Sequence, residues 1–318
     1  MSNFPITLSS FLAIQDVEDY IEEWLNFYLL QGVQKFIIYD YSSKDNTPNL
    51  IKPYMDRGIV EYSYFTERYL EPYKHLDRWF EALSLKHRLD VIEEYREAHK
   101  WMCFFDLDEF TFPTNSPDDL WLSKSGVLEE LNLREWLEAF DKKYEGNVSA
   151  LAINWTIFGD SGEKVKKDDY VISRFNRRAP LDYHEHDHCM VICKPSKVDL
   201  QKSRCEPNPH YFYYFEENKA VNEKGYPAGT PKVINGEYYD FHRAFSAYPE
   251  NCSSIRCNHY MIKSREEYAQ KSLRHEDLNN KNYAEPDENL KIYNSEQDDY
   301  IKKYIPLLNS INLDNYSL

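Results

Sequence analysis

The chain has 318 residues, of which 42% are hydrophobic and 16% aromatic, and its formal net charge is −16. This length allows one large domain or two small ones around a substantial core. The negative charge argues against binding nucleic acid or an anionic lipid surface through bulk charge. The chain contains no 18-residue apolar stretch and its first residues lack a basic region, so we expect neither a transmembrane segment nor a signal peptide.

The N-terminal half alternates apolar runs with helical patterns. Strands are predicted at 4–14, 35–39, 59–65 and 101–105, and helices at 17–30, from Pro48 onward and at 75–98. Strands that alternate with helices predict an α/β fold with a mostly parallel, Rossmann-like sheet and helices on both faces. Ligands of such sheets bind beyond the carboxyl ends of the strands.

After residue 112 the pattern loosens, which predicts an irregular C-terminal half. The expected elements are a helix at 128–141, a strand at 148–158, short strands with long loops over 170–240, and helices at 264–275 and around 296–308. Ser264 and Glu267 match a capping box at the start of one of these helices. The simplest partition is a catalytic domain over residues 1–275 and a C-terminal helical extension over 276–318.

An apolar run that stops at three carboxylates is the strongest chemical signal. In WMCFFDLDEF, residues 101–110, Asp106 and Asp108 lie two apart, so along a strand end both would project to one face. Paired carboxylates suit Mg²⁺ or Mn²⁺, which in turn would hold the phosphates of a nucleotide. Asp40 ends the strand at 35–39 in the same way. The alternative is a solvated acidic turn.

The residues around this signal resemble a known family. WMCFFDLDEFTFP is similar to the DLDEF signature of the DUF23-type glycosyltransferases, which are glycosyltransferase family 92 and its bacterial and viral relatives. Three further stretches follow in the family's order, between about residues 11 and 271: IEEWLNFYLLQGVQKFIIYDYSSKDN, NWTIFGDSGE and NHYMIKSREEYAQK. The resemblance implies a GT-A-like fold and a metal-dependent, inverting glycosyltransferase. Its donor would be a nucleotide-sugar, expected to be a UDP-sugar, and its acceptor a hydroxyl of a glycan.

The resemblance also implies roles for individual residues. Asp106, Asp108 and His259 would hold Mn²⁺ or Mg²⁺. Asp40, Asp106 and Lys263 would contact the nucleotide donor, with Lys263 neutralising the departing diphosphate. The alternatives are a turn cap for Asp40, a structural histidine at 259 and an ordinary solvated lysine at 263.

The base that takes the acceptor proton is less well defined. NWTIFGDSGE is similar to a family block that usually reads W-x-x-F-G-S-S-G, so Asp160 replaces a small hydroxyl residue. Asp160 and Glu163 are the candidates by position, because an inverting transferase needs a carboxylate near the acceptor hydroxyl. A simple glycine turn is the alternative. Asp182, Glu185 and Asp187 compete for the same role.

A zinc site in HEHDHCMVIC, residues 184–193, is disfavoured. If these residues form a strand, Cys189 and Cys193 point to one face and His186 and His188 to the other. The six cysteines show no zinc spacing, and reduced thiols in the cytoplasm are expected.

Two other functions remain open. A nucleotidyltransferase of related fold also uses paired carboxylates, but it needs a glycine-rich basic loop that SSFLAIQDVED lacks. A non-catalytic carbohydrate-binding protein would explain the aromatic content but not both carboxylates. The expected location is the cytoplasm, bacterial or of a host cell if the protein is viral. The sequence does not indicate an oligomeric state.

Overall fold

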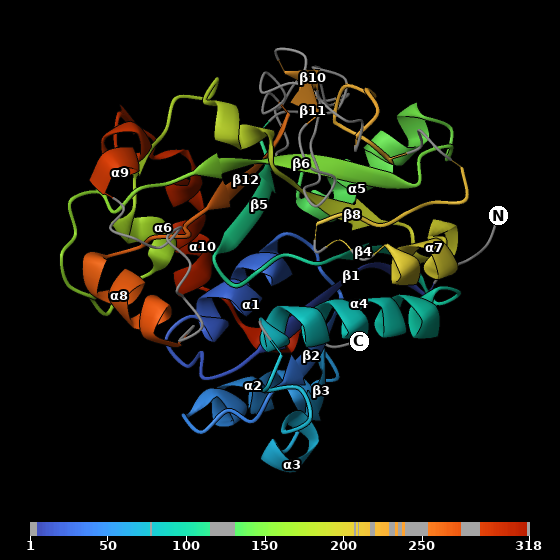
Figure 1. Ribbon diagram of the computed structural model, residues 1–318, viewed down its shortest axis with the longest axis horizontal. Helices are drawn as coiled ribbons and strands as arrows, with labels where there is room; N and C mark the ends of the chain where they lie inside the picture. Colours follow the sequence, from blue (N-terminus) through green and yellow to red (C-terminus); the bar gives the residue numbers. More distant parts are fainter. Residues whose placement is uncertain are drawn as a thin grey trace.

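A single large sheet organises the protein, as the computed structural model in Figure 1 shows. The structure describes residues 5–76, 78–114, 131–206, 208, 210–216, 220–228, 233–234, 237–238, 254–274 and 287–316. The first residues of the predicted helix at 128–141 and the start of the predicted extension at 276–318 lie outside these ranges. Within them, no helix is long and apolar enough to cross a membrane.

The main sheet has nine strands in the order β3-β2-β1-β4-β8-β6-β12-β5, with β9 paired to β6. Its strands are β1 (Ile6–Ile14), β2 (Lys35–Asp40), β3 (Val60–Tyr64), β4 (His99–Cys103), β5 (Glu109–Pro113), β6 (Ala150–Ile157), β8 (Cys189–Cys193), β9 (Ala220–Val221) and β12 (Ile255–His259). β1, β2, β3 and β4 are parallel, and β8 and β5 run antiparallel to their neighbours. Two further pairs are β10 (Val233–Ile234) with β11 (Glu237–Tyr238), and β7 (Arg177–Arg178) with β13 (Glu296–Gln297).

Helices lie on both sides of this sheet (Figure 1). They are α1 (Ile21–Leu30), α2 (Thr47–Met55), α3 (Glu67–Leu70), α4 (Trp79–Tyr95), α5 (Leu133–Lys143), α6 (Val171–Arg174), α7 (Leu200–Cys205), α8 (Arg265–Arg274), α9 (Asp287–Tyr293) and α10 (Ile305–Asn309). Short 3₁₀ helices are η1 (His184–Asp187), η2 (Pro195–Lys197), η4 (Tyr300–Tyr304) and η5 (Leu313–Tyr316).

Alternate residues of the central strands pack into two different cores. Trp101 and Cys103 of β4 join the core formed with α1, α2 and α5, whereas Met102 joins the core formed with α4. The same alternation occurs in β2, where Phe36 and Ile37 face opposite sides. This period of two places an apolar layer on each face of the sheet, which is why the middle of β2 and the end of β4 are continuous apolar runs. The predicted α/β fold with a mostly parallel sheet and helices on both faces is confirmed.

The boundaries of several predicted elements differ from those observed. The strand predicted at 101–105 is observed as β4, His99–Cys103. Phe104 and Phe105 are buried but lie beyond the end of the strand, so the apolar run indicates which residues are buried and not which residues pair in the sheet. The helix predicted at 75–98 is the shorter α4, which begins after the left-handed Arg78 (φ 53°). The histidines of residues 184–193 do not share a strand with the cysteines, because they lie in or beside η1, before β8 begins.

The C-terminal residues 287–316 pack into the main core, with Ile301 fully buried. The helix predicted around 296–308 is divided into β13, η4 and α10, since a proline fits the first turn of α10 but not the interior of one long helix. Asp298 fixes this segment by accepting hydrogen bonds from Arg256 of β12 (2.8 Å) and Arg178 of β7 (2.7 Å). Burial opposes ionisation of Asp298, but the two guanidinium groups more than offset it and lower its pKa.

Replacing this carboxylate should destabilise the fold. Asp298→Ala would leave Arg256 buried without this counter-charge and Arg178 with only the half-exposed Glu296, so we expect the free energy of unfolding to fall by about 3–5 kcal/mol. Its neighbour Asp299 is more exposed and pairs with Lys302, so Asp299→Ala should cost less than about 1 kcal/mol. Denaturant titration measures both values, and equal costs would contradict the anchoring role of Asp298.

Candidate active site

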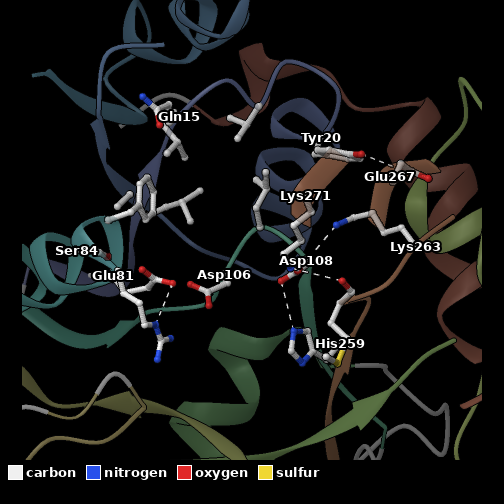
Figure 2. A pocket seen from close by; sticks show the side chains of 18 of the residues that line it. Gln15, Tyr20, Glu81, Ser84, Asp106, Asp108, His259, Lys263, Glu267 and Lys271 are labelled. Carbon is white, nitrogen blue, oxygen red and sulfur yellow. Dashed lines mark hydrogen bonds and ion pairs between the residues drawn. The ribbon is translucent and has the colours of Figure 1, made fainter. Parts of the chain in front are cut away.

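A cavity of about 530 Å³ opens beyond the carboxyl ends of β1 and β4. Its walls are the end of β1 (Leu12–Gln15), the first turns of α4, the turn at Asp106–Asp108 and the segment from His259 to Lys271. Figure 2 shows Asp106 and Asp108 side by side, with His259, Lys263 and Lys271 around Asp108. This size lies within the range of small-ligand sites in proteins.

The two aspartates occupy a tight turn between β4 and β5. The prediction that they project together from a strand end is wrong in its geometry, because β4 ends at Cys103 and the backbone turns before β5 begins at Glu109. The Glu109 carboxylate accepts a hydrogen bond from the Asp106 N–H (2.9 Å), and the Glu109 N–H donates to the Asp106 carbonyl (3.0 Å). Glu109 therefore holds the turn from within the core, and both aspartate side chains still reach the cavity.

Asp108 is a buried carboxylate with two lysine ammonium groups and one imidazole around it. Its Oδ2 lies 2.8 Å from Lys271 Nζ and 3.9 Å from Lys263 Nζ, and its Oδ1 lies 3.5 Å from His259 Nε2. Burial alone would raise the pKa of Asp108, but Lys271, Lys263 and His259 together hold it well below its usual value. The carboxylate is thus ionised in the absence of any ligand.

Asp106 has a different environment. Its side chain is 48% exposed, and Oδ1 accepts a hydrogen bond from Arg88 of α4 at 3.0 Å. Trp24 of α1 donates to its backbone carbonyl at 3.1 Å, which fixes the main chain while the carboxylate faces the cavity. The two neighbouring carboxylates are therefore held by cations from opposite walls.

His259 and Lys263 come from the C-terminal part of the chain. His259 ends β12, which lies between β6 and β5 and pairs His259 with Glu109. This register carries the imidazole to the DLDEF turn. Lys263 follows in the left-handed conformation (φ 56°), an uncommon one for lysine, directly before the capping box that starts α8. Ser264 and Glu267 form that box, as predicted, with a Glu267 N–H to Ser264 Oγ distance of 3.2 Å.

The side chains of Asp106, Asp108 and His259 fit Mn²⁺ or Mg²⁺ in kind, since carboxylates and a neutral imidazole are acceptable ligands. The Nδ1 atom of His259 is buried and has no hydrogen-bond partner within the described structure. Among the described residues, however, no three His, Cys, Asp or Glu side chains are close enough together to hold a metal ion. A divalent cation would therefore have to replace the lysine that now contacts Asp108.

Asp40 lies where the sequence predicts, at the end of β2, but it does not line the cavity. Its carboxylate is buried and accepts hydrogen bonds from Tyr62 (2.6 Å) and from the Ser43 N–H (2.7 Å). This is the turn-capping arrangement that the sequence left open as the alternative.

The candidate bases also lie outside the cavity lining. Asp160 accepts hydrogen bonds from Arg265 (2.9 Å) and Asn294 (2.8 Å), which join its loop to α8 and the C-terminal segment. Glu163 pairs with Lys167 at 2.5 Å. Among their competitors, Glu185 accepts from a tyrosine hydroxyl at 3.0 Å, Asp182 is exposed, and the side chain of Asp187 lies outside the described structure.

Several cavity residues were not found from the sequence. They include Arg88, Trp155, His210 and Lys271. The helical spacing of Glu267 and Lys271 was an available signal, because residues four apart share one face of a helix and the capping box fixes where that helix starts. Arg88 and His210 had no comparable signal, since only the folded chain brings α4 and residue 210 to this cavity.

Residues 12–139 match the sequence model of glycosyltransferase family 92. The match covers about two fifths of the chain and includes Asp106 and Asp108, whereas His259 and Lys263 lie beyond it. It confirms the resemblance inferred from the DLDEF stretch. No curated protein matches the chain in sequence.

Among solved structures, the chain is similar to S. aureus TarS. A complex of TarS 1–349 with UDP-GlcNAc is 13% identical with a TM-score of 0.33, covering 60% of this chain and 46% of that one. A complex with UDP is 14% identical with a TM-score of 0.33, covering 60% and 47%. The chain thus spans about half the length of these TarS chains, and at such TM-scores no feature of their sites is carried over to this protein.

Substitutions at the two candidate bases should separate structure from chemistry. Asp160→Asn should lower the free energy of unfolding by about 1–3 kcal/mol, because Arg265 loses a charged acceptor. Glu163→Gln should have a smaller effect, since Lys167 is exposed. Near-native sugar transfer per folded molecule in both variants, measured by product analysis, would leave these two carboxylates with a structural role alone. A loss on the order of 100-fold at unchanged stability would instead identify the acceptor base.

Proposed function

We propose that this protein, a glycosyltransferase, moves a sugar from a nucleotide-sugar donor to a hydroxyl of a glycan acceptor, with inversion. The expected donor is a UDP-sugar, bound in the cavity with a divalent cation, Mn²⁺ or Mg²⁺. Asp106, Asp108 and His259 would hold the cation, and Lys263 would face the diphosphate. The inverting course and the uridine base are expectations from the family resemblance.

The main support for this proposal is that four predicted site residues share one cavity. The cavity brings together Asp106 and Asp108 from one turn with His259 and Lys263, although about 150 positions of sequence separate the two pairs. Asp106 and Asp108 were chosen from the sequence as a carboxylate pair, and His259 and Lys263 were chosen because of the family resemblance. A structural role for each separately would not require them to share one cavity.

The residues of the site can be assigned distinct tasks. A bound divalent cation would supply positive charge to the departing diphosphate. Lys263 is buried beside Asp108, and its ammonium group would stabilise the same charge without reorganisation of water. Arg88 orients the Asp106 carboxylate through its hydrogen bond. Asp160 and Glu163 stay sequence-based predictions for the group that takes the acceptor proton.

The first test uses the central carboxylate. Asp108→Asn keeps the shape of the side chain and removes its charge, so we expect release of UDP from a panel of UDP-sugars in the presence of Mn²⁺ to fall on the order of 100-fold. The rate should be expressed per folded molecule, since Lys263 also loses its counter-charge. EDTA should abolish turnover of the native protein.

Asp56→Asn is the matched control, because Asp56 forms a 2.8 Å ion pair with Lys52 on the exposed face of α2, away from the cavity. It should leave turnover unchanged. Native turnover that persists in EDTA would contradict the metal, and native turnover by Asp108→Asn would contradict the whole site.

A second test concerns the imidazole. His259→Ala removes a ligand that the proposal gives to the cation, so Mn²⁺ affinity should fall by about 10-fold or more while the thermal transition remains cooperative. Calorimetric titration with Mn²⁺ and then UDP measures this. If both affinities and the turnover stay at native values, the histidine is structural, packed against the Trp155 ring at 4.4 Å.

A further inference from the structure

Two ammonium groups face one carboxylate oxygen at the centre of the cavity. Lys271 Nζ and Lys263 Nζ lie 2.8 and 3.9 Å from Asp108 Oδ2. Both lysines line the cavity, next to the turn that carries Asp106 and Asp108. A phosphate oxygen accepts the same charge-assisted hydrogen bonds from an ammonium group that a carboxylate oxygen accepts.

Glu267, a carboxylate of α8 that also lines the cavity, acts on the charge of Lys263 but has hydrogen-bond partners of its own. Glu267 receives two hydrogen bonds from Arg174, at 3.1 and 2.6 Å, and others from Ser264 and Tyr20. Arg174 and Glu267 are both almost completely buried. Glu267 is thus committed to a partner of its own, outside the group formed by Asp108 and the two lysines.

The two lysine side chains differ in their exposure and in their surroundings. Lys263 is 10% exposed, has a left-handed backbone, and its ammonium group lies 4.8 Å from the centre of the Tyr20 ring. Lys271 is 35% exposed and extends from the second turn of α8, on the face that also carries Glu267 toward the cavity. Of the two, Lys271 is the more exposed, and besides Asp108 its ammonium group contacts the Met261 carbonyl at 3.5 Å.

We propose that Lys271 is a ligand of the donor diphosphate and that it exchanges partners when the site fills. Without donor, Lys271 neutralises Asp108. When the divalent cation occupies the Asp108 carboxylate, Lys271 turns to the phosphate oxygens of the donor. This inference rests on the proposed function and adds to it a binding residue and an order of events.

The exchange makes the two ligands depend on each other. The cation alone must displace an ammonium group from Asp108, and the nucleotide alone meets a lysine that is already paired. When both bind, the cation replaces Lys271 as the partner of Asp108, and the nucleotide phosphate replaces Asp108 as the partner of Lys271. Cation and nucleotide should therefore bind cooperatively, and Lys271 should carry much of that coupling.

Calorimetric titration of the whole chain with MnCl₂ and with UDP tests this directly. For Lys271→Met we expect Mn²⁺ alone to bind about tenfold more tightly than to the native protein, because the competing ammonium group is gone. We expect UDP at saturating Mn²⁺ to bind about tenfold more weakly, because a phosphate ligand is gone. Lys271→Arg, which keeps the charge, should restore UDP binding.

Lys52→Met is the control, since Lys52 forms an ion pair of the same 2.8 Å length outside the cavity and should change neither affinity. Unchanged Mn²⁺ and UDP affinities in a folded Lys271→Met variant would overturn the inference, as would a change in only one of them. If the native protein binds neither Mn²⁺ nor UDP, the proposed function itself fails, and that result is distinct from the others.

Discussion

The buried carboxylate of Asp108 is the constraint on which the site depends. An ionised carboxylate removed from water is costly unless it is paired and hydrogen-bonded. Here its partners are Lys263, Lys271 and His259, which lie more than 150 positions later in the chain. The segment from β12 to α8 must therefore return to the carboxyl end of the sheet before the Asp108 charge is compensated.

A second buried ion pair fixes the segment that supplies these partners. Glu267 of α8 is bound by Arg174 of α6 and by the hydroxyl of Tyr20, which precedes α1. Burial would raise the pKa of Glu267, but these contacts and the Ser264 hydroxyl lower it to about 2, so the pair is ionised at neutral pH. α8 is thereby held against the N-terminal half, and Lys263 and Lys271 both line the cavity beside Asp108. The same network explains why a helix cap and a binding site lie so close together.

The sequence was most informative where a single local pattern determines the outcome. The alternation of apolar runs and helices predicted the sheet, and the match of residues 12–139 confirms the family resemblance. The capping box at Ser264 predicted the start of α8. Asp106 and Asp108 were found because carboxylates that end an apolar run are unusual.

What the sequence did not reveal depends on distances that only the folded chain sets. Asp40 ends a strand as Asp106 nearly does, yet Tyr62 and Ser43 occupy its oxygens and it does not reach the cavity. Asp160 is a candidate base by its position in a glycine loop, but in the folded chain Arg265 and Asn294 donate hydrogen bonds to its carboxylate. Lys271 was missed although its spacing from Glu267 places both residues on one face of α8, because that spacing alone does not say which face meets the cavity. The pairing of charged residues is thus the least predictable part of such a site.

In the proposed function, the cavity beside Asp108 binds the donor together with its cation. Crystals of the whole chain grown with MnCl₂ and UDP, measured at the manganese absorption edge, test it most directly. We predict an anomalous peak in contact with the Asp108 carboxylate, and UDP phosphates between that peak and Lys263. Manganese elsewhere, or UDP bound outside the cavity, would contradict the account.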